Sequence, residues 1–210
     1  MTELLVNNLV TLFVVVDPIG IAVIFSGLTR HGDRVFRSSM ALRATILSTF
    51  ILVAFFFIGE MLLRTLGIGQ PAFRIAGGIL LFMLAIDMVF ARQSGLRSAT
   101  FREREEAFAK EDISVFPLAF PLLAGPGAMT TVLLMADSGK TPAVTAGMVA
   151  IIFIIMGFTL LSLMLSARVM DWLGETGANV ISRLLGLILA ALAVQYIVDG
   201  VRQIAASLGI

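Results

Sequence analysis

The chain has 210 residues, of which 59% are hydrophobic and 14% charged, and its mean hydropathy is +1.01. These values lie outside the range of soluble globular domains, so the composition predicts an integral membrane protein in contact with a lipid bilayer. The net charge of +1 gives no argument for a nucleic-acid partner, and a chain with one histidine and no cysteine lacks the usual zinc ligands. We therefore expect no nucleic acid, no metal and no cofactor.

Six apolar stretches are long enough, or nearly long enough, to cross a bilayer as helices of about 20 residues. They cover residues 4–28, 44–63, 73–90, 113–136, 143–167 and 184–201. The first stretch is preceded by Met1-Thr2-Glu3, which carries no positive charge, so we expect it to stay in the mature protein. The sequence therefore predicts an all-α membrane protein with six transmembrane helices.

The arginines and lysines divide unequally between the two sides of such a protein. Eleven fall in the first, third and fifth connections, and the other four of the 15 fall on the opposite side. The positive-inside rule then places the first, third and fifth connections in the cytoplasm and both termini outside. We expect a multi-pass protein of the bacterial inner (cytoplasmic) membrane.

The longest connection, residues 92–112, separates two groups of three spans. Its charged stretch at residues 102–106 lies between Phe101 and Phe108, a pattern that indicates either a short helix on the membrane surface or a solvated cytoplasmic linker. We predict a single membrane domain with one three-span repeat over residues 1–91 and a second over residues 113–210.

The two groups show a weak internal similarity. At an offset of 108 residues, Pro18 aligns with Pro126, and the third and sixth spans both begin with an arginine and a following glycine, at residues 74–77 and 183–186. Because each group has three spans, the second enters the membrane from the opposite side. The sequence thus predicts inverted repeats, in which a substrate site lies near the midplane between discontinuous helices, here the first and fourth spans.

Asp17-Pro18-Ile19-Gly20 interrupts the first span at its centre, where nothing in hydrocarbon replaces the hydrogen bonds that a proline breaks. One interpretation is an acidic N-cap followed by proline at the first helical position. The other is a substrate site, since an intramembrane carboxylate is by default a functional group. The two interpretations are compatible, because a helix N-terminus also presents free amides to a ligand. We predict that Asp17, Pro18 and Gly20 bind substrate.

Gly125, Pro126 and Gly127 interrupt the fourth span and contain no carboxylate, so the amides that follow them are open to a ligand. The alternative is a proline kink with glycines for helix packing. Thr130 and Thr131, one turn later, would bond either the ligand or carbonyls of their own helix. All five residues are predicted substrate contacts.

Two helix N-termini for an anion and Asp17 for a cation together fit a small zwitterionic solute. Asp17 is also a candidate for proton or ion coupling. Asp87, near the cytoplasmic end of the third span, is a second candidate and is equally well interpreted as an interfacial anchor. The chain has no H-E-x-x-H and no G-x-S-x-G motif, so we do not expect an enzyme.

Three stretches resemble the signatures of a known family. Residues 13–20 (FVVVDPIG), 74–81 (RIAGGILL) and 116–132 (FPLAFPLLAGPGAMTTV) are similar to motifs of the MarC family, and the resemblance extends over essentially the whole chain. It implies a relationship to transporters of small neutral amino acids such as alanine and glycine, with Asp17, Gly20, Gly125 and Gly127 at matching motif positions. One departure is Ile21-Ala22-Val23, which replaces an Asn-containing stretch of many members.

The sequence therefore favours a secondary transporter that moves small neutral amino acids by alternating access around the two breaks, with proton coupling as an option. Two other functions stay open. One is an exporter of another small solute or of drugs, and the other is a non-transporting membrane scaffold for partner proteins. Inverted repeats make a complete pathway within one chain plausible and are compatible with a homo-oligomer.

Overall fold

The computed structural model of the protein describes residues 2–30, 32–90, 112–138 and 141–208. Within these ranges the chain forms helices and no strands. In order, the elements are α1 (Thr2–Val16), α2 (Pro18–Leu28), α3 (Arg34–Thr65), α4 (Gln70–Phe90), the π-helical segment η1 (Ser114–Leu123), α6 (Pro126–Ser138), α7 (Pro142–Met164) and α8 (Ser166–Ser207). The predicted linker over residues 92–112 lies, apart from Asp112, outside the described residues.

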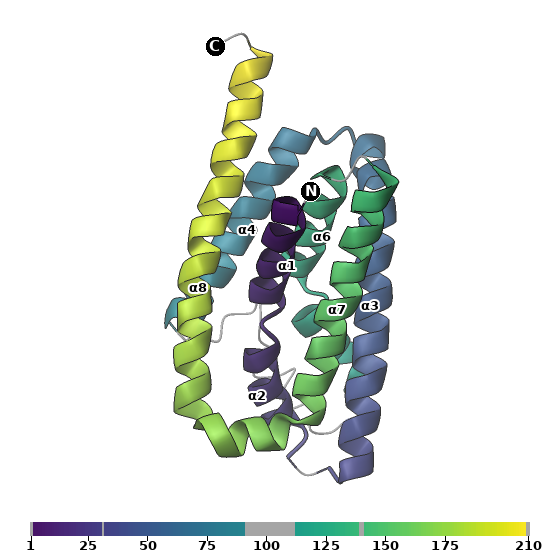
Figure 1. The fold of residues 1–210 in the computed structure, drawn as a ribbon, viewed down its shortest axis with the longest axis vertical. Helices are drawn as coiled ribbons and strands as arrows, with labels where there is room; N and C mark the ends of the chain where they lie inside the picture. Colours follow the sequence, from purple (N-terminus) through teal and green to yellow (C-terminus); the bar gives the residue numbers. More distant parts are fainter. Residues whose placement is uncertain (1, 31, 91–111, 139–140, 209–210) are drawn as a thin grey trace.

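Most of the helices run along one common axis, and both ends of the chain lie at the same end of the bundle (Figure 1). The described part of the chain contains five helical stretches long and apolar enough to cross a membrane, α1 and α2 counting as one, and six if the bent pair of η1 and α6 is counted as another. The expectation of an all-helical, multi-pass membrane protein is confirmed. The division into two inverted repeats stays a prediction.

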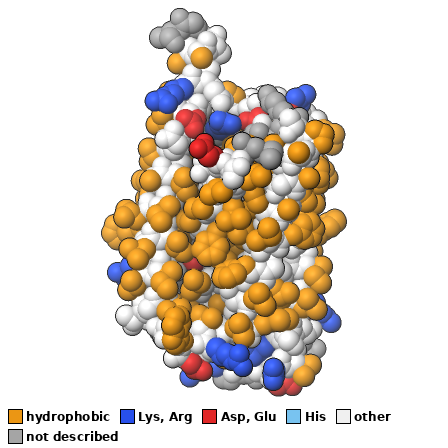
Figure 2. All heavy atoms as spheres, in the orientation of Figure 1, with side chains coloured by type: hydrophobic (Ala, Val, Ile, Leu, Met, Phe, Trp, Pro, Cys, Tyr) orange, Lys and Arg blue, Asp and Glu red, His pale blue; other side chains and the backbone are white. Residues whose placement is uncertain are grey.

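The outer surface of the bundle is apolar along most of its length. Figure 2 shows hydrophobic side chains over the middle of the molecule and charged side chains gathered at its two ends. Phe50 of α3, Phe153 of α7 and Leu187 of α8 are among the large exposed apolar residues. Such a surface is stable only against lipid, so these outward faces are the part of the protein that contacts the bilayer.

The core surrounds α1 and α2, the purple helices at the centre of Figure 1. Leu12 and Ile21 from these helices, Leu52 from α3 and Met156 from α7 are almost completely buried in one cluster. The two central helices therefore make their contacts with protein on most sides and lie away from the lipid. Any residue at the junction between α1 and α2 is placed in the interior of the bundle.

Two spans are longer helices than hydropathy predicts. α3 begins at Arg34 rather than near residue 44, because Asp33 caps it by accepting a hydrogen bond from the amide of Phe36 at 2.7 Å. α8 begins at Ser166, breaks at Gly174 with φ of 63°, and continues to Ser207, whereas the prediction covered only residues 184–201. The segment before Gly174 lies across the end of the bundle (Figure 1).

α4 and α8 form the most extensive helix pair in the described structure. Glycines allow the two backbones to approach closely: a Cβ atom on Gly78 would lie 2.8 Å from the carbonyl oxygen of Ala193, and one on Gly186 would lie 2.7 Å from the Cβ of Met88. Small residues at the contact are the usual means of packing helices in membranes, where the hydrophobic effect does not drive association. This pair forms one wall of the bundle beside α1.

Candidate functional site

The first break lies between α1 and α2 and is caused by the backbone of Asp17. This residue adopts φ 46° and ψ 67°, the one positive φ of a non-glycine residue in the described ranges. The left-handed conformation costs an L-residue about 1–2 kcal/mol, and aspartate is one of the residues that adopts it most readily. Helical hydrogen bonds continue on both sides, from the amide of Asp17 to the oxygen of Phe13 (2.9 Å) and from the amide of Ile21 to the oxygen of Asp17 (3.0 Å). The predicted interruption is therefore a local, hydrogen-bonded break, and α1 and α2 still follow one another as a single candidate span.

The carboxylate of Asp17 is completely buried and is held by groups from two helices. Its Oδ1 accepts a hydrogen bond from the amide of Gly20 at 3.1 Å, which is the N-cap interaction of α2. Its Oδ2 accepts a hydrogen bond from the hydroxyl of Ser182 of α8 at 3.0 Å. The capping interpretation of Asp17 thus has direct geometric support, and the carboxylate also joins α2 to α8.

Gly20 is required by this arrangement. A Cβ atom at position 20 would lie 2.2 Å from Oδ2 of Asp17 and 2.8 Å from the hydroxyl oxygen of Ser182. Contacts this short do not occur in folded proteins, so any larger residue would displace the carboxylate. The glycine of the Asp-Pro-Ile-Gly motif therefore has a packing role at the site, whatever its role toward a substrate.

The second break lies between η1 and α6, whose axes are bent by 56°. Phe116 and Phe120 within η1 have extended backbone angles, as residues before proline usually have, and both of the following peptide bonds are cis. A Cβ atom on Gly125 would lie 2.2 Å from the carbonyl oxygen of Pro121, so this glycine is also required by a close approach. α6 then begins at Pro126 and has no acidic residue in its first turn.

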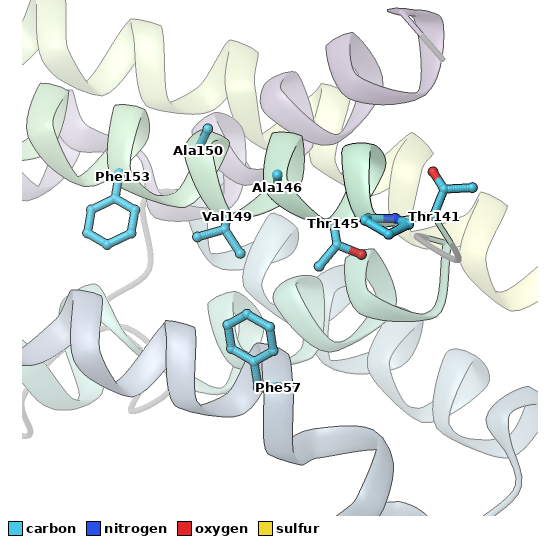
Figure 3. A pocket seen from close by; sticks show the side chains of 8 residues that line it. Phe57, Thr141, Thr145, Ala146, Val149, Ala150 and Phe153 are labelled. Carbon is cyan, nitrogen blue, oxygen red and sulfur yellow. The ribbon is translucent and has the colours of Figure 1, made fainter.

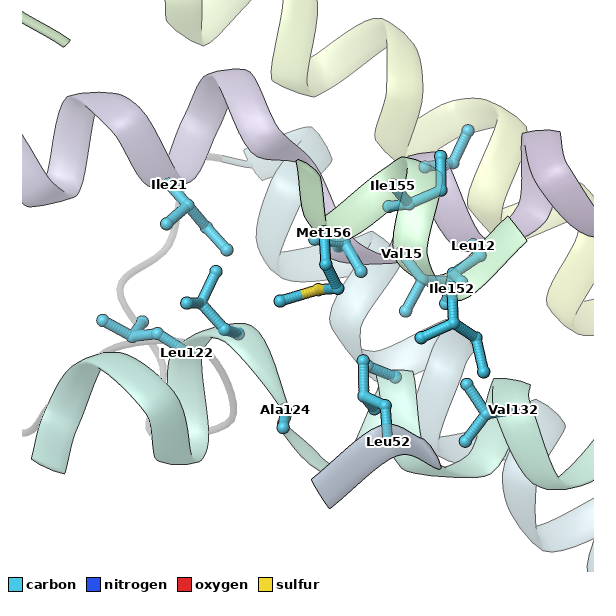
Figure 4. Packing of buried hydrophobic residues seen from close by; sticks show 14 of the residues in the cluster. Leu12, Val15, Ile21, Leu52, Leu122, Ala124, Val132, Ile152, Ile155 and Met156 are labelled. Carbon is cyan, nitrogen blue, oxygen red and sulfur yellow. The ribbon is translucent and has the colours of Figure 1, made fainter. Parts of the chain in front are cut away.

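The two breaks meet in the interior of the protein. The position of a Cβ atom on Gly127, at the start of α6, lies 3.5 Å from Cγ1 of Val15, which is two residues before Asp17. Figure 4 shows Ile21 of α2, Leu122 of η1 and Met156 of α7 directed into the space between the same helices. All three side chains are buried. The region between the breaks is therefore filled by apolar side chains in this conformation.

The two threonines that follow the second break face their own helix and a neighbour. The hydroxyl of Thr131 donates to the carbonyl oxygen of Gly127 at 2.9 Å, as the alternative interpretation of this residue anticipated. The methyl group of Thr130 lies against Gly77 of α4, where a Cβ atom would be 2.2 Å from it. Both threonines thus have packing roles here, and their contact with a substrate stays a prediction.

Asp87 is buried in α4, on the face that also buries Leu84 and Met88. A buried carboxylate in a membrane span is expensive. Asp87 lies three residues before the end of α4, so a site wall and an interfacial anchor both stay predictions. Asp87 belongs to α4 and Asp17 to the junction of α1 and α2, and both carboxylates are buried. Which of them takes part in coupling stays a prediction.

Sequence reasoning missed two polar groups that hold the breaks in place. Ser182 lies in the polar stretch that precedes the predicted sixth span and gave no hydropathy signal. Ser48 of α3 is completely buried and donates to the oxygen of Ala44 at 2.7 Å and to the oxygen of Ala119 in η1 at 3.3 Å. Ser48 could have been identified from the sequence, because it is a polar residue within a long apolar span.

The described structure has a large groove at a different place. Figure 3 shows it between Phe57 of α3 and the outer face of α7 from Thr141 to Phe153. Its volume is about 690 Å³, and its walls are mainly apolar. None of its lining residues belongs to either break. Since it opens on the lipid-facing surface, the groove is not part of the candidate site.

The described residues also contain no group of three or more histidine or acidic side chains that could hold a metal ion.

A helical bundle with an apolar outer face and two helix breaks that meet inside it defines a multi-pass membrane protein with discontinuous helices. The chain belongs to the MarC family: the model described as "MarC family integral membrane protein" matches residues 2–205. The resemblance drawn from the three sequence stretches is thereby confirmed.

Relatives in other organisms cover nearly the whole chain. The UPF0056 membrane protein YvbG of Bacillus subtilis is 38% identical over 206 residues, which is 96% of each chain. The UPF0056 inner membrane protein YhgN of Escherichia coli K12 is 33% identical over 199 residues, 95% of this chain and 96% of that one. The UPF0056 membrane protein of Aquifex aeolicus is 34% identical over 202 residues, 96% of this chain and 94% of that one. No solved structure matches. The names describe membrane proteins and state no activity.

Proposed function

We propose that the protein is a secondary transporter that carries small neutral amino acids, of the alanine and glycine class, across the inner membrane. The observation that carries this proposal is the meeting of the two helix breaks inside the bundle, with Gly127 against Val15 and the buried Asp17 two residues further on. Broken helices that face each other near the midplane are the usual binding sites of secondary transporters.

The chemistry of the two breaks suits a zwitterion. The Asp17 carboxylate would attract an ammonium group. The start of α6 carries the positive end of a helix dipole and no acidic residue in its first turn, so it would attract a carboxylate. Gly125 and Gly127 are closely packed in the described conformation. Once these contacts separate, the lack of a side chain would let a ligand approach the backbone closely. A small neutral amino acid carries both charged groups and little else.

Transport by alternating access requires the apolar contacts between the breaks to separate. Ile21, Leu122 and Met156 fill this space in the described conformation, which supports its assignment to a closed state of the cycle. We propose that the two three-span units, residues 1–91 and 113–210, move relative to one another to open the site on alternate sides. Both termini would face outward, and either Asp17 or Asp87 would take up the coupling ion.

A second candidate, an exporter of a less polar solute, is favoured by one observation. The side chains between the breaks are apolar, and opening them would create a hydrophobic wall on one side of the site. The two candidates differ in selectivity. An amino acid transporter should reject analogues that lack the ammonium group or the carboxylate, whereas an exporter of apolar solutes should accept them.

The test is uptake of labelled alanine and glycine into liposomes that hold the purified protein, with and without an imposed pH gradient. Asp17→Asn should reduce the flux by about tenfold or more, a change of about 1.4 kcal/mol in the barrier for each factor of ten. Asparagine can still cap a helix, so the fold should survive.

Asp33→Asn is the matched control, because Asp33 caps α3 through the same kind of hydrogen bond outside the membrane spans. It should leave the flux unchanged. A folded wild-type protein that moves neither amino acid, in either direction, would show that the amino acid assignment is wrong.

A further inference from the structure

A second cavity lies at the end of the bundle that carries both chain termini. It has a volume of about 220 Å³ and is enclosed by the last turns of α3, the turn at residues 66–69, the first turns of α4 and the end of α6. Leu63, Phe73 and Leu133 form its apolar wall. The volume is below the roughly 300–1,000 Å³ of cavities that hold drug-sized molecules, so only a small solute would fit.

Four polar side chains line the same cavity: Glu60, Arg64, Gln70 and Asp137. At the mouth, Nη2 of Arg64 lies 2.6 Å from Oε1 of Glu60, and these side chains are 78% and 44% exposed. The inner polar group is Asp137, which accepts hydrogen bonds from the Gln70 amide and from Arg74 (2.8 Å) and is only 17% exposed. The lining of the cavity thus presents both signs of charge, and Arg74, which lies outside the lining, neutralises Asp137.

We infer that this cavity is an outer recognition site for a small zwitterionic solute. Glu60 binds the ammonium group and Arg64 binds the carboxylate, so that the ligand exchanges one exposed ion pair for two charge-assisted pairs. The exposed Glu60–Arg64 pair contributes little to folding, and opening it for a ligand therefore costs little. Asp137, already neutralised by Arg74, forms the polar floor beside the apolar wall.

The cavity is separate from the candidate site at the helix breaks. Asp137 lies near the end of α6, and the second break lies at the start of this helix of 13 residues. At 1.5 Å per residue, the two ends of α6 are about 20 Å apart. The cavity thus lies on the termini side of the protein, at the opposite end of α6 from the second break. The identity of that solute as an amino acid rests on the proposed function.

The absence of cysteine from the chain allows a direct test. Ile68 lines the cavity, so Ile68→Cys places a single thiol in its wall. The rate at which a maleimide modifies this thiol is measured on the full-length protein in detergent, with increasing alanine or glycine. We expect both amino acids to slow the modification severalfold. Ethylamine and propionate, which each carry one of the two charges, should have no effect.

Four further variants decide where the ligand binds. Adding Glu60→Gln or Arg64→Gln to Ile68→Cys should abolish the protection. Arg43→Gln, which alters another exposed ion pair, with Asp112, should leave the protection unchanged. Protection should also be absent at Trp172→Cys, which places an exposed thiol outside the cavity.

Adding Asp17→Asn to Ile68→Cys separates this inference from the proposed function. Protection that persists in this variant supports an independent outer site, even if the liposomes show no flux. Three results would overturn the inference. One is that neither amino acid protects the thiol of Ile68→Cys when this is the only substitution. The others are that ethylamine or propionate protects it equally well, or that protection is lost when Asp17→Asn is added. Flux without protection would leave the proposed function in place and remove the outer site.

Discussion

The hydroxyl of Ser182 donates a hydrogen bond to Oδ2 of Asp17 over 3.0 Å, although the two residues are 165 positions apart in the sequence. Through this contact α8 takes part in the first helix break, and the carboxylate at the centre of the candidate site is fixed from two directions. The stability of the site therefore depends on a residue outside both sequence motifs.

Ser182→Ala should lower the stability of the protein by about 1–3 kcal/mol, because a buried carboxylate loses a hydrogen-bond donor. The measurement is the Tm in detergent. Ser182→Thr keeps a hydroxyl and should recover part of the loss. Ser207→Ala, near the exposed end of α8, removes a hydroxyl that bonds only the backbone oxygen of Ile204 and should change stability by less than about 0.5 kcal/mol. Equal Tm values for the two alanine variants would contradict the role of Ser182.

Two glycines of α2 should respond oppositely to alanine. Gly20→Ala places a methyl group 2.2 Å from the Asp17 carboxylate and should cost about 1–3 kcal/mol through overpacking. Gly27→Ala has nothing within 4 Å of the new methyl group, so it should be neutral or stabilise the helix by up to about 1 kcal/mol. Thermal unfolding of both variants is the test. A stable Gly20→Ala protein would mean that the carboxylate can move away without loss.

The contact between Gly77 and Thr130 predicts a coupled pair of substitutions. Gly77→Ala should destabilise the protein by about 1–3 kcal/mol, because its methyl group would overlap the Thr130 methyl group. Thr130→Ser removes that methyl group and keeps the hydroxyl, so it should restore much of the loss when combined with Gly77→Ala. A double-mutant cycle should give a coupling energy of about 0.5–3 kcal/mol. Simple additivity of the two changes would show that α4 and α6 do not pack as described.

Arg74 and Arg43 form ion pairs that differ in burial, so replacing them should lower the stability of the protein by different amounts. Arg74→Gln leaves Asp137 as a mostly buried carboxylate without its cation and should cost about 1–3 kcal/mol. Arg43→Gln breaks the exposed pair with Asp112 and should cost less than about 1 kcal/mol. The comparison of Tm values in low and high salt adds a check, since the exposed pair should be the more sensitive to screening. A larger loss for Arg43→Gln would reverse this ranking.

The acid dependence of stability should include a small contribution from Asp112. Hydrogen bonds from the Ser114 hydroxyl and backbone amide, helped by Arg43, hold the pKa of Asp112 below its usual value of 3.8. A lowered pKa in the folded state stabilises the protein above pH 3.8, and this stabilisation is lost as the pH falls through the folded pKa. The Tm difference between wild type and Asp112→Asn should therefore be present at neutral pH and shrink in acid. Arg43→Gln should retain most of the pH dependence, since Ser114 provides the larger effect.

Several features could be predicted from the sequence because they depend on local composition. The membrane class follows from hydropathy, since a long apolar helix is stable only in lipid. The positions of both helix breaks could be predicted from proline and glycine within such a helix, since proline is common where a helix begins and disturbs hydrogen bonding within one. The capping role of Asp17 was likewise readable from the order of Asp17 and Pro18. Three short motifs were also enough to indicate the family.

Other features were decided only by the tertiary structure, because they depend on which distant residues pack together. The bond from Ser182 to Asp17, the contact of Gly127 with Val15 and the packing of Thr130 on Gly77 each join separate helices. The early starts of α3 and α8 escaped hydropathy because their first turns contain polar residues. Asp33 caps α3, whereas α8 begins after Leu165 without a side-chain cap. Local sequence thus determined where the helices break, and helix packing decided what each break contacts.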